Sequence, residues 1–429
     1  LLERPASDKL KERLASGVAD ALSAFEKKTG VELAPAQREA IELASTSRLV
    51  VVTGGPGVGK TTIVRAMLSV FAHAKLDARL AAPTGRAAKR MSEATGQPAQ
   101  TLHRMLEFDP QKRAFGRGRA RPIDADALVV DEASMLDIEL ADALLEGLAD
   151  DARLVLVGDV DQLPSVGPGA VLRDVIASRR VPTARLTRIF RQAEGSLIVS
   201  NAHRIHDGQL PESAARPDGE FFVVPRTTGE AAADGIIEVV TQRIPKRFGL
   251  DPRRDVQVLT PMHRGESGAI ALNERLQATL NPSGAEVTRG SKRLRVGDKV
   301  MQLRNDYDKD VYNGDLGFIT TLDAEARELT VRFDGKDKDV LYEESEIDEL
   351  TLAYATSIHK SQGSEYPAVV VPILMQHFIM LSRNLLYTAV TRGKRLVVVV
   401  GDPRAISLAL AEIHKEDRLT RLAARIREG

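Results

Sequence analysis

Residues 50–62 read VVVTGGPGVGKTT: an apolar β-branched run, a glycine-rich loop, and then Lys60 and Thr61. The loop matches the phosphate-binding pattern G-x-x-x-x-G-K-[ST], in which backbone N–H groups turn inward toward phosphate oxygens. In this pattern the lysine reaches the β- and γ-phosphates, and the threonine hydroxyl ligates Mg²⁺. The sequence therefore predicts a nucleoside triphosphate site rather than a glycine-rich turn that binds nothing. The residues expected to touch the nucleotide are Gly55, Gly57, Val58, Gly59, Lys60, Thr61 and Thr62.

Composition narrows the class of protein. The 429 residues suffice for two or three domains, and 60 basic side chains balance 60 acidic ones, so a polyanion would have to bind a local cluster of charge. The chain has no cysteine, which excludes disulfides and fits a reducing, cytoplasmic location. No apolar run is long enough for a membrane span, so we expect no membrane partner. The chain starts at Leu1 rather than Met, and we expect it to be part of a longer protein.

Short apolar runs alternate with helical segments, which predicts an α/β protein with parallel sheets covered on both faces. One series comprises LVVVTGG, ARLAAPT, ALVVDEAS and ARLVLVGD, and a second comprises EFFVVP, DVQVLTP, LTLAYATS, AVVVPIL and RLVVVVGD. We expect a helical element over residues 1–33, one α/β domain over 34–200 and another over 201–429. Two stretches break the alternation: an arginine-rich excursion at about 107–124, expected to form a β-hairpin, and a small all-β insertion at about 290–348.

Polar residues at two strand ends predict the second half of the triphosphate site. The strand ALVV runs into Asp131 and Glu132, which would hold Mg²⁺ and polarise the attacking water. The alternative is that the aspartate caps a helix. Gln162 follows the strand ARLVLVGD and is a candidate sensor of the γ-phosphate, although taken alone a polar turn residue is the simpler interpretation.

Two arginines are candidates for contacting the transferred phosphoryl group, because the planar guanidinium matches its oxygens. They are Arg191, in LTRIFRQ, and Arg392, in YTAVTRGKRLVVVV. Arg392 precedes the last strand of the second series. If the two α/β domains face each other across a nucleotide, it would act as an arginine finger from the second domain. A single arginine is more often a surface charge, so this role depends on context.

Six segments occur in a fixed order: GGPGVGKTT, VVDEASML, GDVDQLPSVGPG, LTRIFRQ, ATSIHKSQGSEY and LLYTAVTRGK. Together they resemble the motif series of superfamily 1 DNA helicases, and most of all the RecD-like branch of superfamily 1B, over about residues 34–405. The resemblance implies two tandem RecA-like P-loop NTPase domains, with a strand-separating hairpin in the first and a small SH3-like β-barrel in the second. It implies a monomeric ATP-dependent helicase that uses ATP and Mg²⁺ and moves 5′→3′ on single-stranded DNA. Its partners would be single-stranded DNA and single–double-strand junctions, in DNA repair or recombination.

The resemblance also implies individual roles. Gln37 would read the adenine, Glu365 would contact the sugar, Gln162 would sense the γ-phosphate, and Arg191 and Arg392 would clamp it. The residues that match DNA-contacting segments are Pro83, Thr84, Arg86, Thr101, His103, Ser357, His359, Lys360 and Ser361. For His359, packing inside a helix remains an alternative. The basic residues of the excursion would lie at the duplex junction or form a solvated loop: Lys112, Arg113, Arg117, Arg119 and Arg121.

Three other functions remain open from the sequence. The first is an RNA helicase or translocase of the same superfamily, because no motif detects a 2′-hydroxyl. The second is a P-loop kinase or switch GTPase, which would not need a second α/β domain carrying Arg392. The third is a binding module without catalysis, which the intact Lys60, Asp131 and Glu132 argue against.

Overall fold

The computed structural model describes the following residues: 14, 17–188, 195–290, 292–306, 308–323, 325–412, 418 and 420–428. The chain divides into two compact units. Unit 1 comprises Leu1–Glu194 and Glu416–Gly429, and unit 2 comprises Gly195–Lys415. Our expected boundaries differ from this division, because the change of unit precedes α9 (Leu197–His206) and the C-terminal segment belongs with unit 1.

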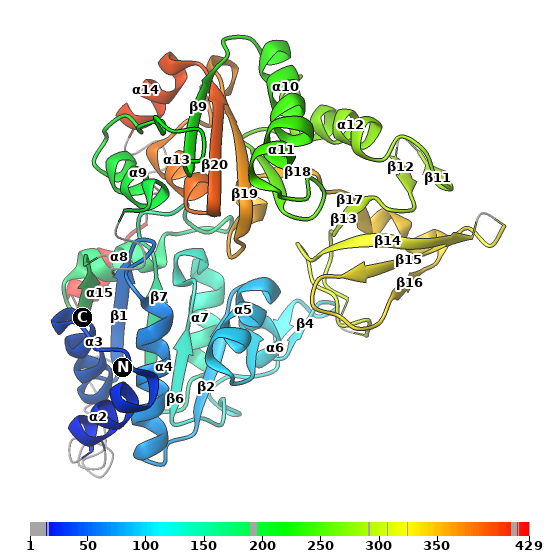
Figure 1. Cartoon of the computed structure of the whole chain (residues 1–429). Helices are drawn as coiled ribbons and strands as arrows, with labels where there is room; N and C mark the ends of the chain where they lie inside the picture. The colour runs from blue at the N-terminus through cyan, green and yellow to red at the C-terminus, as the bar shows by residue number, and fades with distance from the viewer. Residues whose placement is uncertain are drawn as a thin grey trace. The chain divides into compact units, whose positions relative to one another are not determined.

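Unit 1 is built on a six-stranded parallel sheet with the order β3-β2-β6-β7-β1-β8 (Figure 1). Its strands are β1 (Leu49–Gly54), β2 (Ala78–Ala82), β3 (Ala99–Thr101), β6 (Ala127–Val130), β7 (Arg153–Gly158) and β8 (Thr183–Leu186). Side chains alternate across the sheet, so Val50 and Val52 enter one core and Val51 enters the other. Burial on both faces explains the nearly continuous apolar runs from which β1, β2, β6 and β7 were predicted.

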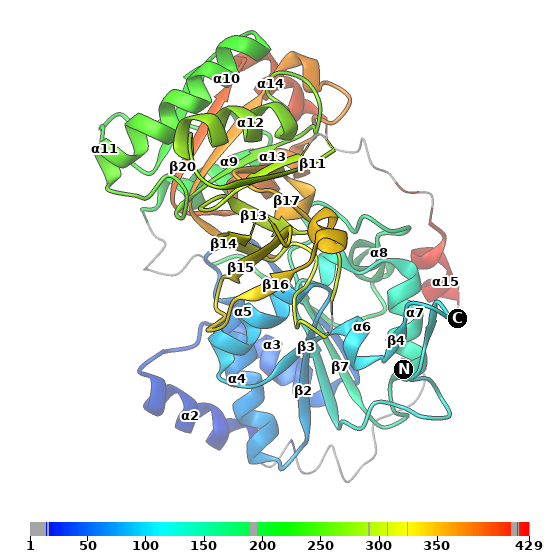
Figure 2. The same ribbon diagram turned by 90° about the vertical axis from the view of Figure 1, so that its right-hand side faces the viewer.

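Helices cover both faces of this sheet (Figure 2). They are α2 (Val18–Thr29), α3 (Pro35–Thr46), α4 (Lys60–His73), α5 (Gly85–Thr95), α6 (Leu102–Met105), α7 (Ile138–Gly147), α8 (Val171–Ser178) and α15 (Leu422–Glu428). The first three pack on the face of Val50 and Val52, and α6, α7 and α8 pack on the face of Val51. Between α6 and β6, β4 (Phe108–Asp109) pairs antiparallel with β5 (Ala114–Phe115), which confirms the predicted hairpin.

Unit 2 contains a five-stranded parallel sheet with the order β18-β10-β19-β20-β9. Its strands are β9 (Phe221–Pro225), β10 (Val256–Thr260), β18 (Ala355–Ser357), β19 (Tyr366–Ile373) and β20 (Gly393–Gly401). Its helices are α9, α10 (Gly229–Glu238) continued by a π-turn (Val239–Arg243), α11 (Ile244–Phe248), α12 (Ala269–Leu280), α13 (Arg383–Val390) and α14 (Pro403–Ala411). The α10–α12 group covers one face of the sheet, and α9 and α13 contact the strands from the other.

The predicted all-β insertion is present in unit 2. Strands β16, β15, β14, β13 and β17 form an antiparallel sheet in that order, and β11 pairs with β12 beside it. The strands are β11 (Glu286–Arg289), β12 (Lys292–Arg295), β13 (Lys299–Gln302), β14 (Leu316–Asp323), β15 (Glu328–Phe333), β16 (Val340–Tyr342) and β17 (Leu350–Leu352). The stretch LTLAYATS was expected to be one strand. It is instead split, because β17 joins the insertion and β18 joins the parallel sheet.

A buried carboxylate connects the insertion to the rest of unit 2. Asp298 is fully buried, and its Oδ1 accepts hydrogen bonds from Asn281 Nδ2 at 2.7 Å and Tyr354 Oη at 3.0 Å. Its Oδ2 accepts from Gln277 Nε2 at 2.5 Å and from the backbone N–H of Arg295 at 2.7 Å. These donors come from α12, the end of β12 and the residue before β18. One side chain therefore fixes three segments to one another, which also explains why LTLAYATS bends at Tyr354.

Across the helices that the structure describes, none has both the length and the apolar character that crossing a bilayer requires.

Candidate functional site

The glycine-rich loop joins β1 to α4 at the carboxyl edge of the unit 1 sheet. Gly57 and Gly59 have φ angles of 76° and 79°, a region that glycine adopts without strain, so the loop can curl at the end of β1. Lys60 is the first residue of α4, and its Nζ donates to the carbonyl oxygens of Gly54 at 2.5 Å and Gly55 at 3.0 Å. The ammonium group is therefore held across the loop, at a helix N-terminus that favours anions.

Gln37 is tied directly to this loop. Its side chain is only 2 % exposed, its Nε2 donates to the carbonyl of Val58 at 3.3 Å, and its Oε1 accepts from the N–H of Ala34 at 3.0 Å. Thr61 and Thr62 follow Lys60 in the first turn of α4, the former exposed and the latter half-buried. The predicted nucleotide residues of α3, the loop and α4 thus form one continuous group.

Asp131 and Glu132 lie at the carboxyl end of β6. Burial and the negative Glu132 raise the pKa of Asp131 to about 6, and Lys60 and Arg90 act in the opposite direction. The N–H of Glu132 donates to Asp131 Oδ1 at 2.8 Å, and Glu132 has a left-handed φ of 53°. Arg90 of α5 places Nη1 3.9 Å from Glu132 Oε1. The two carboxyl groups are therefore oriented by the backbone and by two basic side chains.

The chemistry of this pair fits a divalent cation. A buried carboxyl group whose pKa is raised gains from a nearby positive charge, which favours its ionised form. Within the described part of the chain, no group of three or more His, Asp or Glu side chains could hold a metal ion. Magnesium fits such a sparse site, because it is usually held by one or two carboxylates, water and the phosphates of the substrate.

Gln162 occupies the turn that follows β7. Its side chain is 7 % exposed, and its Nε2 donates to Asp159 Oδ2 at 3.2 Å. The N–H of Val160 in the same turn donates to Thr53 Oγ1, in β1, at 3.3 Å. Since β6, β7 and β1 are adjacent and parallel, their carboxyl ends bring Asp131, Gln162 and Lys60 to one edge of the sheet, where ligands of open α/β sheets bind.

Arg392 lies directly before β20 in unit 2 and is only 3 % exposed. Its Nη1 donates to the carbonyl of Ser364 at 3.1 Å and its Nη2 donates to Thr391 Oγ1 at 3.4 Å, whereas its buried Nε has no partner. Glu365 forms an ion pair with Lys394 at 3.2 Å beside it. A buried guanidinium with an unsatisfied N–H is costly unless a ligand pairs with it, which fits an anion-binding role.

The predicted DNA residues of unit 1 cluster where two helices begin. Thr84 caps α5 by accepting from the N–H of Ala87 at 3.3 Å, and Thr101 caps α6 by accepting from the N–H of Arg104 at 3.2 Å. Strands β2 and β3 are neighbours, so these helix starts lie side by side. Pro83 and Arg86 are half-buried around the first of them.

His103 packs against the hairpin. Its ring centroid is 5.4 Å from that of Phe108 and 6.0 Å from that of Phe115, and the two phenylalanine rings are 5.0 Å apart. Burial lowers the pKa of His103, and Asp137 partly opposes this shift. The histidine therefore joins the base of the hairpin to α6. The contacts give it a packing role whether or not it also touches DNA.

The basic residues of the hairpin region have acidic neighbours. Four of the five predicted there form exposed or half-exposed ion pairs at N–O distances between 2.6 and 3.2 Å: Lys112–Asp109, Arg117–Glu107, Arg119–Glu146 and Arg121–Glu107. Arg113 lies at the turn with a left-handed φ of 48°. The positive charge of this segment is thus largely balanced, which weakens the argument for DNA contact from charge alone.

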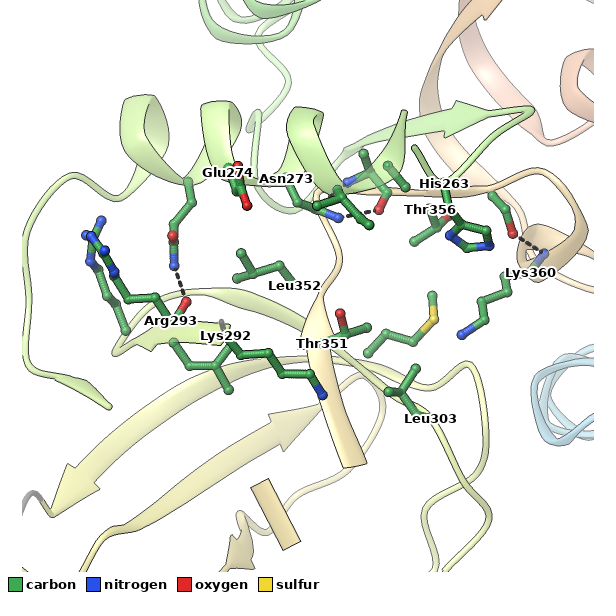
Figure 3. Close-up of a pocket in the computed structure, with 18 of the residues that line it drawn as sticks. His263, Asn273, Glu274, Lys292, Arg293, Leu303, Thr351, Leu352, Thr356 and Lys360 are labelled. Carbon is green, nitrogen blue, oxygen red and sulfur yellow. Dashed lines mark hydrogen bonds between the residues drawn. The ribbon is translucent and has the colours of Figure 1, made fainter. Parts of the chain in front are cut away.

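A pocket of about 710 Å³ in unit 2 lies between α12, β12 and the end of β18 (Figure 3). Ser357 and Lys360 line it, as does Thr356, whose buried hydroxyl has no partner. Its lining combines basic and hydroxyl side chains with apolar ones such as Leu352. The basic and hydroxyl residues that line it are His263, Lys292, Arg293, Arg295, Thr351, Thr356, Ser357 and Lys360. This mixture suits a ligand with phosphates and flat apolar groups.

The other two predicted residues of this segment do not line the pocket. Ser361 is fully buried and donates its hydroxyl to the carbonyl of Ile358 at 2.6 Å, and His359 is half-buried. Asn273 of α12 pairs with both backbone groups of Ala355 at 2.8 Å, so it holds the edge strand β18 as another strand would. This contact supports the backbone that presents Thr356 and Ser357.

Comparison with known proteins identifies the family. Residues 37–168 match a family model described as AAA domain, residues 272–333 match the ATP-dependent RecD-like DNA helicase SH3 domain, and residues 352–400 match the UvrD-like helicase C-terminal domain. The RecBCD enzyme subunit RecD of Mycolicibacterium smegmatis is 32 % identical over 428 aligned residues, which cover 91 % of this chain and 74 % of that protein. The chain belongs to the RecD family. Its all-β insertion is accordingly an SH3-like barrel, as expected.

A second relative agrees with RecD family membership, and a solved structure agrees with the fold. The ATP-dependent RecD2 DNA helicase of Deinococcus radiodurans is 38 % identical over 94 % of this chain, and the chain spans 54 % of that protein's length. Among solved structures, a Pif1 helicase from Bacteroides in complex with ADP-AlF3 and ssDNA matches with a TM-score of 0.54 and 21 % identity, covering 93 % of this chain and 97 % of that one. At this identity the structural match supports the fold alone, which is two tandem RecA-like domains.

The RecD fold gathers the predicted nucleotide residues into two groups, one in each unit, around Lys60 and around Arg392. Arg191 lies outside the described residues. Arg90 was not among the predicted residues, although APTGRAAKRM places it four residues after Arg86 on a helix. Also not predicted were Thr356, which adjoins the predicted Ser357, and Asn273, for which no local signal exists because its partner is 82 residues away.

Proposed function

We propose that this chain is the motor of an ATP-dependent DNA helicase, which acts as a monomer and moves 5′→3′ along single-stranded DNA during repair or recombination. The observation that carries the proposal is the group formed by Lys60, Asp131, Glu132 and Gln162 at one sheet edge, in a member of the RecD family. The names of the relatives, an ATP-dependent RecD2 DNA helicase and RecBCD subunits, support the same activity.

ATP would bind the loop of unit 1. Lys60 would contact the β- and γ-phosphates, Glu132 would orient and deprotonate the attacking water, and Gln162 would sense the γ-phosphate. Thr61 and Asp131 would hold Mg²⁺, which neutralises charge on the phosphate oxygens. Gln37 would form hydrogen bonds to the adenine, next to the Val58 carbonyl that its side chain contacts.

Unit 2 would complete the site. The unpartnered Nε of Arg392 supports a role as an arginine finger, because a phosphate oxygen would satisfy it. Arg191 and Glu365 would contact the γ-phosphate and the sugar. If ATP ties the two units together and hydrolysis releases them, alternating grip on DNA would produce stepping.

Single-stranded DNA would contact Thr84 and Thr101 in unit 1 and the pocket around Ser357 and Lys360 in unit 2. Hydroxyl, amine and backbone donors bind phosphates without reading bases, as movement along any sequence requires. The apolar side chains that line the pocket support contact with bases. The hairpin β4–β5, held by His103, would separate the strands at the junction.

A strand-displacement assay tests the proposal. Duplexes with a 5′ or a 3′ single-stranded tail are incubated with enzyme, ATP and Mg²⁺, and we expect release only from the 5′-tailed substrate. Unwinding of only the 3′-tailed substrate would refute the polarity. Lys60→Ala should abolish ATP hydrolysis and unwinding but retain most DNA binding by fluorescence anisotropy. An ATPase that RNA oligonucleotides stimulate more than DNA would instead favour the RNA translocase.

A further inference from the structure

The C-terminal segment returns from unit 2 to unit 1. Helix α14 belongs to unit 2, but Arg418 and α15 belong to unit 1, where α15 packs beside α8 in both views (Figures 1 and 2). Leu422 and Ile426 add to the core formed by α7 and α8. The chain therefore joins the two units twice, once before α9 and once after α14.

The guanidinium group of Arg418 donates four hydrogen bonds to one loop of unit 1. Its Nη1 donates to Ser165 Oγ at 3.2 Å, to the carbonyl of Gly169 at 2.7 Å and to that of Gly167. Its Nη2 donates to the carbonyl of Ser165 at 2.5 Å. Loop carbonyls have no partners from regular secondary structure, and the rigid guanidinium fork supplies several donors at once. Arg418 thus holds residues 165–169 together with the Ser165 hydroxyl, which donates to the carbonyls of Gly167 at 3.1 Å and Gly169 at 3.4 Å.

The loop 165–169 adjoins the two segments of unit 1 that carry the proposed catalytic residues, one with Gln162 and the other with Asp131 and Glu132. It begins three residues after Gln162, and Ser165 is itself buried. On its other side, the carbonyl of Pro168 accepts from the N–H of Ile138 at 2.9 Å, next to the Asp137 that caps α7. A Cβ on Gly167 would lie only 2.3 Å from Asp137 Oδ2, so the loop is tightly packed there. The segment 131–137 begins with Asp131 and Glu132.

We propose that Arg418 is a positioning residue for ATP hydrolysis. Arg418 follows α14, the last helix of unit 2, along the chain and holds the loop 165–169. This loop in turn keeps Gln162 and the segment after Glu132 in their catalytic positions. The inference rests on the proposed function, because it assigns a supporting role at the same nucleotide site. It predicts that nucleotide binding survives loss of Arg418, whereas the hydrolysis step slows.

The test compares Arg418→Ala and Arg418→Lys with Arg427→Ala. Arg427 is a matched control, because it lies on the same segment and its Nη2 donates to the carbonyl of Ala177 at 2.6 Å, away from the loop. DNA-stimulated ATP hydrolysis is measured for each variant. For Arg418→Ala we expect kcat to fall on the order of tenfold to a hundredfold, with KM for ATP and DNA affinity within about threefold of wild type. Arg418→Lys should recover part of kcat, and Arg427→Ala should stay within about twofold.

A kcat for Arg418→Ala equal to that of Arg427→Ala would overturn the proposal, as would parallel losses of kcat, nucleotide binding and melting temperature. Hydrogen exchange of the wild-type protein gives a measurement that needs no variant. Adding ADP with aluminium fluoride should increase protection in residues 159–170 and 418–428 together, and protection of the first segment alone would also refute the inference. If the wild type shows no DNA-stimulated hydrolysis, the proposed function fails, and the exchange result still decides whether the two segments are coupled.

Discussion

Replacing Asp298 with alanine should lower the free energy of unfolding of unit 2 by an amount that its hydrogen bonds predict. The substitution removes the acceptor of four hydrogen bonds, whose donors are three buried side chains and the half-buried backbone N–H of Arg295. Each unpaired buried donor costs about 1–3 kcal/mol. Removing the carboxylate recovers part of its burial penalty, the same penalty that raises the pKa of Asp298. Because these effects oppose each other, we expect a net loss of about 4 kcal/mol in the free energy of unfolding.

The distribution of tyrosines makes this loss measurable in unit 2 alone. All six tyrosines of the chain lie between residues 307 and 387, within unit 2. There is no tryptophan, so intrinsic fluorescence during urea titration reports this unit. With a urea dependence of about 2–3 kcal/mol/M, Asp298→Ala should lower the midpoint by roughly 1–2 M. Asp298→Asn should fall in between, because its amide keeps one oxygen and adds one conflicting donor.

The control is Asp337→Ala, which removes an exposed aspartate from a turn of the same barrel. Its midpoint should stay within about 0.3 M of wild type, since surface substitutions rarely change stability by more than about 0.5 kcal/mol. A midpoint for Asp298→Ala that matches this control would show that the four contacts do not stabilise the junction, and the reasoning would be wrong.

Two further predictions concern other buried groups. Burial lowers the pKa of His377 to about 4, so the unfolded chain takes up a proton at a higher pH than the folded chain does. The contribution of His377 to the free energy of unfolding should therefore be full above pH 6.5 and decline by at most about 3 kcal/mol as the pH falls toward 4. Urea titrations at several pH values should show a smaller decline in His377→Gln, and an unchanged decline would contradict the assignment. Gly54→Ala should destabilise unit 1 by about 1–3 kcal/mol and abolish ATP binding, because the new Cβ would lie 2.7 Å from the carbonyl of Leu186. Gly118→Ala, where a Cβ meets nothing within 4 Å, is the control in thermal unfolding and nucleotide titration, and equal effects of the two variants would refute the steric argument.

Much of the parallel architecture was predictable, because a strand buried on both faces must be apolar along its length. The short edge strands β3 and β8 were not predicted. They are only three and four residues long and each includes half-buried and exposed positions, so their sequences carry a weaker pattern. The split of LTLAYATS was also unpredictable. Both halves are apolar, and only the hydrogen bond from Tyr354 to Asp298, 56 residues earlier, marks where the chain changes sheets.

The expected chemistry could be inferred from the sequence alone, from a phosphate loop with Lys60, an acidic pair at Asp131, and an ordered motif series that resembles the RecD family. These features are visible because each depends on residues adjacent in sequence, where local backbone geometry requires particular side chains. The contacts that support these features become visible only in the folded chain. Arg90 faces Glu132, Asn273 holds β18, Asp298 ties the barrel to the sheet, and Arg418 binds a loop about 250 residues before it. Such contacts leave no local pattern, because the partners are brought together by folding rather than by spacing along the chain.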